Sequence, residues 1–470
     1  MTHRPLFVSL IACSLLPSVA CKDEAGDLGS DASETDGADG TAGDTDETDT
    51  AAADPSDPTF TYWRDAKAVI DAKCGDCHQP DDIAPFSLTT YEEVAAVAAV
   101  LPASLMSESM PPWFASDQCQ QYAHDRSLDP EELELLLTWL DEGAPEGDPA
   151  DAPAAGSDDS GEADWAPSVT LQMPEPYTPT QEPDDYRCFV MPWSQQQSQY
   201  VTGYRVRPGN RSIVHHVILF NAAPEDAAEV LAMDEADPGP GYTCFGGSGV
   251  RAGPVGSWVP GTDITRLPED TGVAVEPGSM MIMQLHYNTL SSGAASDQTS
   301  IELELRDEVA SPGRTLPVTN FGWPTGLEPM LIPAGDPAVS HSYEMPVSAF
   351  TMLLGSQLDL EPGQPLLVHS LGMHMHYLGT AGRLSVIRDD DQEDCLLQID
   401  DWDFNWQGNY ELREPIPVTA SDRVRIDCTW DNSAGNQPVI DGEIPEPQDV
   451  QWGEGTRDEM CLGSIYVTAG

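Results

Sequence analysis

Hydrophobic positions recur with a helical period only between about residues 58 and 147. In YWRDAKAVIDAK, the residues Trp63, Ala66 and Ile70 stand three or four positions apart and fall on one stripe, which predicts a helix. A second helix is predicted over residues 91–105.

A third helix is marked at both of its ends. Asp129 is suited to cap its N-terminus, Pro130 suits its first turn, and Gly143 is expected to stop it after a leucine-rich run. The three segments together predict a small all-α unit over residues 58–147.

The pattern changes after an acidic linker at residues 148–170, which is rich in Ala, Gly and Pro. The rest of the chain is too long for one β-sandwich, so two are predicted, over residues 171–310 and 311–470. The expected fold is therefore a small all-α domain followed by two all-β, jelly-roll-like sandwiches. The strand signals are short hydrophobic or alternating runs separated by Gly, Pro, Asn and Asp: SIVHHVILF, MMIMQLHYN, TSIELEL, FTMLLGS and LLVHSLGMHMHYL.

The start of the chain carries an export signal. Residues 1–21, MTHRPLFVSLIACSLLPSVAC, combine a short start bearing Arg4, an apolar run and small residues before Cys21, as a signal peptide does. Cys21 closes a sequence that looks like a bacterial lipobox, which predicts a lipid anchor in the outer membrane, with the protein periplasmic or on the cell surface. The sequence LIAC, which ends at Cys13, matches a lipobox better but leaves a very short apolar run before it. Secretion without a lipid anchor is the alternative. Residues 22–57 are acidic and nearly free of apolar side chains, so a disordered tether is expected.

The charge of the chain narrows the class of partner. The formal net charge is −60 at pH 7. Binding to nucleic acid is excluded, because a phosphate backbone requires a basic surface. An exported chain also lies in an oxidising compartment, where disulfides persist.

A haem-attachment sequence follows the first predicted helix. The spacing CGDCH is that of a c-type haem site, in which the thiols of Cys74 and Cys77 bind the vinyl groups and His78 binds the iron. The three helices with this sequence resemble a small class I cytochrome c, so haem c is an expected cofactor.

The sixth iron ligand is expected downstream. Met110 lies in MPPW, where the prolines stiffen the loop that would hold a thioether against the iron. Met106 and His124 are the alternatives. Ligation by His and Met raises the reduction potential, which suits electron transfer.

Five histidines gather in three of the predicted strands: His215 and His216, then His286, then His374 and His376. Imidazoles with a thioether nearby, and without thiolate, favour copper over zinc. His374 and His376 share a strand face and can chelate one ion. His215 and His216 would point to opposite faces of a regular strand, and they reach one ion only with an irregular backbone or through different ring nitrogens. Two metal sites of unlike geometry are therefore predicted.

The succession HH, QLHYN, HMHYLG and DEMC, in this order, resembles the copper type II ascorbate-dependent monooxygenases, the relatives of peptidylglycine alpha-hydroxylating monooxygenase and dopamine beta-monooxygenase. The resemblance covers about residues 170–470, with DYRC at residues 185–188 and RLP at residues 266–268 as further matches. It implies two jelly-roll-like sandwiches that face each other across a solvent cleft and hold two copper ions.

The resemblance also implies the reaction, its partners and the ligands. An activated C–H bond of a small organic substrate would be hydroxylated with O2, and electrons would come from ascorbate or a periplasmic electron donor. The ligands implied for the electron-donor copper are His215, His216 and His286, and those implied for the oxygen-activating copper are His374, His376 and Met460.

Two disulfides follow from the same resemblance. Cys188–Cys244 would staple the first sandwich, and Cys428–Cys461 would pin the strand that presents Met460. Each contributes about 2–4 kcal/mol in typical proteins.

Three further residues have open assignments. Cys119 and Cys395 have no assigned partner, and a bond between them would tie the haem unit to the sandwiches. Gln284 lies on the face of His286 by strand parity and resembles a family glutamine. It is expected either to support the copper ligands or to be an ordinary strand glutamine.

Two positions depart from the peptide-amidating relatives. Those relatives have an arginine two residues before the HxH pair and a tyrosine four residues after the copper methionine, and both grip the peptide carboxylate. Gly372 and Ser464 stand at these positions here. Loss of a bidentate arginine contact costs about 1.5–3 kcal/mol, so peptide amidation is not expected.

These observations predict a copper monooxygenase tethered to a haem unit that passes electrons to the coppers, in place of ascorbate or between it and them. The alternative is a haem–copper electron-transfer or copper-binding lipoprotein without hydroxylase activity. The position that two histidines and a methionine leave open for O2 favours the enzyme. A third interpretation is an adhesin-like β protein with inert histidines.

Overall fold

The computed structural model describes residues 58–75, 77–80, 84–153, 165–289, 292–354, 357–358, 360–439, 443–453, 455 and 457–470. The signal peptide, Cys21 and the acidic tether therefore lie outside the described residues. Residues 55–470 form one compact unit. Within the described ranges, no helix is both long enough and apolar enough to cross a bilayer.

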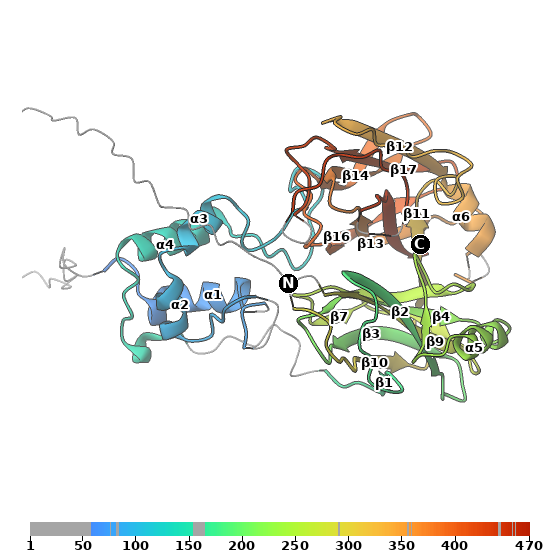
Figure 1. The fold of residues 1–470 in the computed structure, drawn as a ribbon, viewed down its shortest axis with the longest axis horizontal. Helices are drawn as coiled ribbons and strands as arrows, with labels where there is room; N and C mark the ends of the chain where they lie inside the picture. The colour runs from blue at the N-terminus through green and yellow to red at the C-terminus, as the bar shows by residue number, and fades with distance from the viewer. Residues whose placement is uncertain are drawn as a thin grey trace, which may run out of the picture. The chain divides into compact units, whose positions relative to one another are not determined.

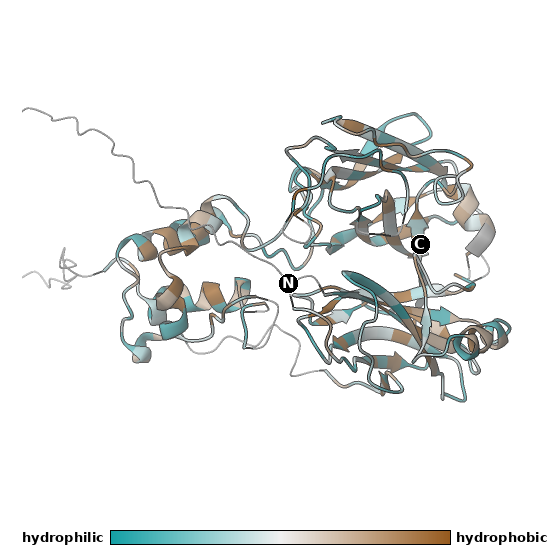
Figure 2. Cartoon of the chain, in the orientation of Figure 1, coloured by the Kyte–Doolittle hydropathy of each residue, from teal (hydrophilic) through white to brown (hydrophobic). Residues whose placement is uncertain are grey.

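The helical elements are mostly short and lie mainly before residue 152. Hydrophobic residues are concentrated in the helices and strands (Figure 2). The bounds of the helices are η1 (Tyr62–Ala66), α1 (Lys67–Lys73), α2 (Tyr91–Val97), α3 (Leu101–Met106), α4 (Pro130–Asp141), η2 (Pro149–Asp151), α5 (Ala227–Ala236) and α6 (Val347–Leu354).

Two of the three predicted helices are confirmed. The stripe in YWRDAKAVIDAK forms η1 and α1, although its first turn is π-helical. The third forms α4, where the Asp129 carboxylate accepts hydrogen bonds from the backbone N–H groups of Glu131 and Glu132, both at 2.8 Å. Gly143 follows its end with a φ of +88°, which favours glycine.

The single helix predicted over residues 91–105 is wrong, because the segment forms α2 and α3 instead. Pro102 has no backbone N–H and its ring would clash with a carbonyl in the preceding turn, so it is tolerated only in the first turn of a helix. It lies in the first turn of α3. The chain turns at residues 98–100 before α3 begins.

The helical unit has its own core, but part of it belongs to the second sandwich. Tyr62, Ile70 and Trp139 are buried among its helices. In contrast, Ala115 and Tyr122, which lie between α3 and α4, are buried in the core of the second sandwich. The unit predicted over residues 58–147 is therefore not self-contained.

A disulfide bonds the segment between α3 and α4 to the second sandwich. Cys119 is bonded to Cys395, the pairing that the sequence left open. Nearby, the Tyr122 hydroxyl donates to the carbonyl of Leu396 at 3.0 Å. The helical unit is thus joined to the second sandwich by a covalent bond as well as by packing.

The strands form three sheets: β1-β10-β3-β8-β11-β18-β13-β16 with β7 beside β3, then β12-β17-β14-β15, and β5-β2-β9-β4-β6 (Figure 1). Their bounds are β1 (Val169–Gln172), β2 (Asp184–Pro192), β3 (Gln199–Arg207), β4 (Val214–Ala222), β5 (Tyr242–Thr243), β6 (Gly253–Trp258), β7 (Ile264–Arg266), β8 (Thr271–Val275), β9 (Met280–Asn288), β10 (Ser300–Arg306), β11 (Ser311–Val318), β12 (Val339–Pro346), β13 (Leu366–His374), β14 (Gly379–Ile387), β15 (Glu393–Ile399), β16 (Asn409–Val418), β17 (Arg423–Trp430) and β18 (Leu462–Ala469).

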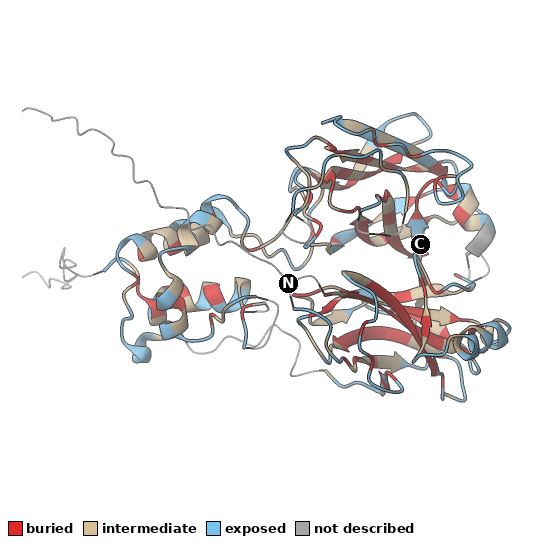
Figure 3. Ribbon diagram, in the orientation of Figure 1, coloured by how far each residue is buried: buried red, intermediate tan, exposed pale blue. Residues whose placement is uncertain are grey.

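Two large cores lie between these sheets, as predicted for β-sandwiches. The strand expected at FTMLLGS is wrong, because its described part lies in the helix α6. The core of the first sandwich draws mainly on β1–β4, β6 and β8–β10, and that of the second on β11–β18. The buried residues are concentrated in these strands (Figure 3). The change from one sandwich to the other falls at residues 307–310, between β10 and β11.

The two sandwiches share one sheet. The N-terminal end of β11 pairs in parallel with β8 of the first sandwich, and β11 then pairs with β18 of the second. Tyr466 of β18 is buried in the core of the first sandwich, and its hydroxyl donates to the Thr271 hydroxyl at 3.0 Å. Backbone hydrogen bonds therefore join the sandwiches directly.

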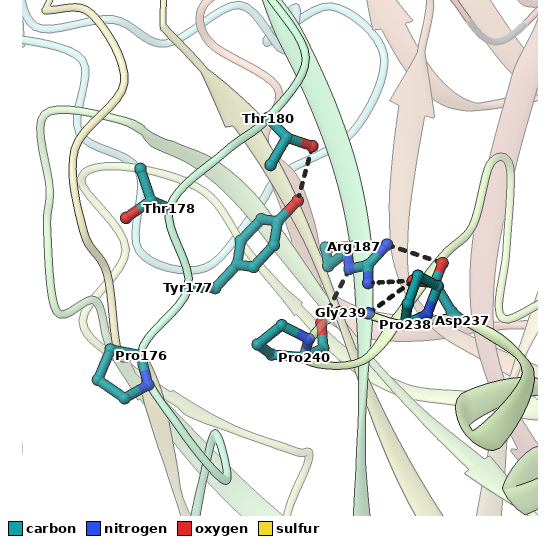
Figure 4. A pocket seen from close by; sticks show the side chains of 9 residues that line it. All are labelled: Pro176, Tyr177, Thr178, Thr180, Arg187, Asp237, Pro238, Gly239 and Pro240. Atoms are coloured by element: carbon teal, nitrogen blue, oxygen red, sulfur yellow. Dashed lines mark hydrogen bonds and ion pairs between the residues drawn. The ribbon is translucent and has the colours of Figure 1, made fainter.

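A pocket of about 430 Å³ lies where β2 meets the loop at residues 237–240 (Figure 4). The guanidinium of Arg187 donates two hydrogen bonds to Asp237, at 2.7 and 3.0 Å, one to Thr243 and two to the carbonyls of Pro240 and Gly241. Arg187 therefore anchors the loop that leads to Cys244, and the contacts favour a structural role for this pocket.

Replacing Asp237 by Asn should destabilise the protein in a pH-dependent way. Hydrogen bonding from Arg187 lowers the pKa of Asp237 from 3.8 to about 2. A carboxyl whose pKa falls on folding stabilises the fold above its unfolded pKa, and that contribution is lost as the pH falls toward the folded pKa. We expect Asp237→Asn to cost roughly 1.5–3 kcal/mol at pH 7, measured by urea unfolding.

The difference between wild type and variant should shrink between about pH 4 and pH 2. Asp234→Asn is the matched control, because burial raises the pKa of Asp234 and its charge gives no such stabilisation. An Asp237→Asn variant as stable as wild type at pH 7 would show that the loop does not depend on this ion pair.

Candidate metal centres

The first histidine set depends on an irregularity in β4. The register of β4 against β9 shifts between Val214 and His216. Val214 and Val217 both lie in the core of the first sandwich, so the extra residue lets His215 and His216 leave the core side together. This is the irregular backbone that the sequence required for the pair to reach one ion.

Three imidazoles meet on the β5-β2-β9-β4-β6 sheet, on the face turned away from the core of the first sandwich. His215, His216 and His286 can each place one ring nitrogen within 4.8 Å of the others. The two Nδ1 atoms of His215 and His216 are 3.4 Å apart. The Nδ1 of His286 is buried without a hydrogen-bond partner among the described residues, which marks it as the atom left for a ligand bond.

The opposite nitrogen of His286 is fixed. Its Nε2–H donates to the carboxylate of Asp184 at 2.8 Å, and the ring stacks on Tyr186 with the planes 6° apart and the centroids 4.1 Å apart. Burial lowers the pKa of His215 to about 4 and holds those of His216 and His286 well below the ordinary value. The rings are therefore neutral at pH 7, the state in which imidazole binds metal.

The second set lies on one face at the end of β13. The Nε2 atoms of His374 and His376 are 3.2 Å apart. The Nδ1–H of His376 donates to the carbonyl of Asp458 at 2.9 Å, and that of His374 donates to the side-chain oxygen of Gln407. These two hydrogen bonds direct both Nε2 atoms toward one point. Burial lowers the pKa of both rings, and that of His376 falls to about 3.

Glu459 connects Met460 to this pair. Its buried carboxylate accepts the backbone N–H groups of His376 at 2.8 Å, Leu378 at 2.7 Å and Met460 at 3.3 Å, and the indole N–H of Trp430 at 2.8 Å. Burial raises the pKa of Glu459 to about 7, while these donors oppose the rise. One side chain therefore holds the backbone on both sides of the candidate site.

Both disulfides that the resemblance implies are present, Cys188–Cys244 and Cys428–Cys461. Gln284 lies two residues from His286 on the same strand face, but its amide donates to the carbonyl of Gly247 at 2.9 Å and reaches Cys244. Its contacts are with the disulfide loop, and none with a histidine ring is found in the described part of the chain.

The haem-attachment sequence lies at the end of α1. Cys74 and Cys77 are not among the cysteines of the three disulfides. The Nδ1 of His78 lies 2.9 Å from the carbonyl of Phe86, which fixes the ring and leaves Nε2 for a ligand bond. The thiols of Cys74 and Cys77 and the Nε2 of His78 are the groups that a c-type haem would bind.

The candidate sixth ligands differ in exposure. Met110 is partly buried just after α3, where its backbone N–H donates to Ser104. Met106 is 66% exposed, and the side chain of His124 is 87% exposed beside Glu411. Both alternatives are thus more exposed than Met110, and the choice of Met110 stays a prediction.

The two histidine sets lie against each other. The rings of His216 and His374 have centroids 6.4 Å apart, and His215 stacks on Phe404 of the second sandwich at 5.1 Å. A solvent cleft between the sites was expected, so this contact is a difference from what the resemblance implied. The shared sheet and the loop that carries Phe404 account for it.

Comparison with protein families assigns both sandwiches. Residues 169–293 match the N-terminal domain of the copper type II ascorbate-dependent monooxygenases, and residues 361–468 match the C-terminal domain. The chain carries both domains of a copper-dependent monooxygenase. These domains are characteristic of enzymes, and the family binds two copper ions and uses O2, ascorbate and a substrate.

Solved structures resemble this monooxygenase only distantly. The major capsid protein P2 of bacteriophage PM2 has a TM-score of 0.22 and 7% identity, over 61% of this chain and 98% of the capsid chain. The VP2 subviral particle of infectious bursal disease virus has a TM-score of 0.16 and 10% identity, over 68% of this chain and 76% of that one. Scores this low support no argument about fold.

Most of the side chains that orient the candidate ligands carry no local sequence signal. Asp184, Gln407 and Glu459 each hold a candidate ligand through a hydrogen bond, and Phe404 lies between the two sets. Glu459 stood in the quoted DEMC, directly before Met460, and was the only one with a local signal. Asp184 and Gln407 are 102 and 33 residues from the rings that they bind, so no local pattern marks them.

Removing one orienting side chain should weaken one copper site and spare the other. Residues that hold metal-binding histidines typically contribute about 10–100-fold to metal affinity. We expect Asp184→Ala to weaken the His286 site by this factor, and Gln407→Ala to weaken the His374 site. Copper titration against a competing chelator, with the two sites resolved by electron paramagnetic resonance (EPR), measures both.

Each of these variants is the control for the other. Equal losses at both sites in either variant would mean that the side chain acts on the fold and not on its own histidine.

Proposed function

We propose that this monooxygenase hydroxylates an activated C–H bond of a small organic substrate with O2. One copper would be held by His215, His216 and His286, and the other by His374, His376 and Met460. The observation that carries the proposal is the orientation of five neutral imidazoles into two sets, of which His286 and His376 are fully buried, with the Nδ1 of His286 left unpartnered among the described residues. Bound copper would supply one-electron redox chemistry and, beside Met460, a position for O2.

The chain's own contribution is orientation and exclusion of water. Asp184, Gln407 and the Asp458 carbonyl hold the far nitrogen of three rings, so those rings need not reorganise when metal binds. His286, His376 and Met460 are 0%, 1% and 5% exposed. A reactive intermediate formed there would be shielded from bulk solvent.

The same face suggests which substrates are excluded. Gly372 and Ser464 are cross-strand partners on the face that carries His374, and a methyl group on Gly372 would lie 2.9 Å from the Ser464 hydroxyl. The side chain of Asn409 lies beside them. The two positions that grip a carboxylate in the peptide-amidating relatives are thus small and uncharged here. We therefore propose a substrate that is not held by a terminal carboxylate.

Copper-loaded protein with ascorbate should consume O2 in the presence of a suitable substrate and release a hydroxylated product. The expected product carries one atom of labelled oxygen, detected by mass spectrometry. His376→Ala should abolish both uptake and product. His341→Gln is the matched control, because His341 binds the carbonyl of Leu331 outside both sets.

Turnover that survives in His376→Ala would refute the proposed site. Stoichiometric copper binding without O2 uptake across a small-molecule library would instead favour the electron-transfer or copper-binding alternative.

We further propose that a haem c bound at Cys74, Cys77 and His78 passes electrons to the first copper site. The support is contact between the haem-attachment sequence and the first sandwich. A methyl group on Gly261 would come within 2.6 Å of Cys77 Sγ, and Arg126 donates to the Gly261 carbonyl at 2.9 Å.

From Gly261 the contacts continue to the histidines. The indole N–H of Trp258 donates to the carbonyl of Thr262 at 2.6 Å, and Trp258 is the cross-strand partner of Val217, next to His216. A through-space contact between Cys77 and Gly261, followed by a short series of bonded and hydrogen-bonded groups, therefore leads from the haem-attachment sequence to the first site.

Reduced haem should reoxidise when the copper-loaded protein is mixed with O2 and substrate in a stopped-flow spectrometer. Met110→Ala should slow this reoxidation, because it removes the expected iron ligand, and Met106→Ala should leave it and the haem spectrum unchanged. If His78→Ala and Met110→Ala retain full turnover with a physiological donor, the haem does not feed the copper sites.

A further inference from the structure

One aromatic ring contacts both candidate copper sites. Phe404 lies in the segment between β15 and β16 of the second sandwich. Its ring is stacked on His215 of the first site, with centroids 5.1 Å apart and planes 17° apart. It also lies edge-on to His376 of the second site at 5.9 Å, and it packs on Tyr377 at 4.3 Å.

The segment that carries this ring is fastened to the second site. The amide of Gln407 donates to the carbonyl of Phe404 at 2.9 Å, while its oxygen accepts the Nδ1–H of His374. The indole N–H of Trp402 donates to the carbonyl of His376 at 3.2 Å. The segment that carries Phe404 is therefore hydrogen-bonded to both histidines of its own sandwich, through the side chains of Trp402 and Gln407.

The opposite side of the ring meets the other sandwich with little access to water. Phe404 is 5% exposed. Beside it, His216 and His374 lie edge to face with centroids 6.4 Å apart. Packed rings thus fill the space between the two sites. Outside the two histidine sets, Phe404 is the one aromatic ring among the described contacts that touches a candidate ligand of each site.

We propose that Phe404 is a positioning residue that holds the two metal sites in contact, so that an electron passes between them without crossing bulk solvent. The inference rests on the proposed function, since it takes the two histidine sets as copper sites. The step served would be a one-electron transfer in which copper held by His215, His216 and His286 would be the donor and O2 beside His374 and His376 the final acceptor. No covalent bond to Phe404 forms or breaks.

The experiment is EPR of the full-length protein loaded with two Cu(II) ions, in frozen solution. Because the rings of the two sites touch, wild type should show strong dipolar broadening. Phe404→Ala should narrow the signal toward that of two independent ions and slow reoxidation of the first site in single turnover by roughly tenfold, the scale of a lost aromatic contact. Phe404→Tyr, which retains the ring, should restore both.

Two controls separate this role from a general loss of structure. Phe321→Ala removes a 55% exposed ring from the same sandwich and should match wild type in both measurements. Copper stoichiometry and thermal unfolding of each variant show whether the sites still form. The informative result is Phe404→Ala with two coppers bound.

Either of two outcomes would overturn the inference. The first is a Phe404→Ala protein with two coppers, wild-type broadening and a wild-type rate of transfer. The second is a wild-type protein whose two copper signals do not interact. A protein that binds two interacting coppers but hydroxylates nothing would refute the proposed function and leave this inference standing.

Discussion

The hydrogen-bonded sheet that runs through both sandwiches is the constraint on which the metal sites depend. The parallel pairing of β8 with β11 and the antiparallel pairing of β11 with β18 fix one sandwich against the other through backbone bonds. Such a junction is stiffer than a linker, because moving the sandwiches apart would leave buried N–H and C=O groups unpaired. This pairing brings His216 and His374, which are 158 positions apart in the sequence, within reach of each other, and the loop that carries Phe404 fills the space beside them.

Burying five imidazoles has an energetic cost that the surrounding residues offset. Burial lowers the pKa of every one of these rings, so they fold in the neutral form, and a buried polar nitrogen needs a partner. Asp184, Gln407 and the Asp458 carbonyl supply partners for three of them. The nitrogens that face inward are left for a metal ion, which means that metal binding and stability of the fold should rise together.

Local patterns identified the parts of the fold that depend on local physics. The two ends of α4 could be predicted because Asp129 and Gly143 each act within one turn of the helix. The helix predicted over residues 91–105 failed where Pro102 was overlooked, and that too is a local rule. The packing of Ala115 and Tyr122 into the second sandwich had no local sign, because their partners lie some 275 residues away.

Residue types and strand parity were enough to predict the candidate copper ligands, the order in which the strands present them, and the need for an irregular backbone at His215 and His216. Side-chain type and strand parity are properties of neighbouring residues, so they can be predicted from short stretches of sequence. The distance between the two histidine sets, the partners of the outer ring nitrogens and the place of Phe404 came from the folded chain alone. These features depend on long-range strand pairing and on loop packing, and neither produces a periodic pattern of residues in the sequence.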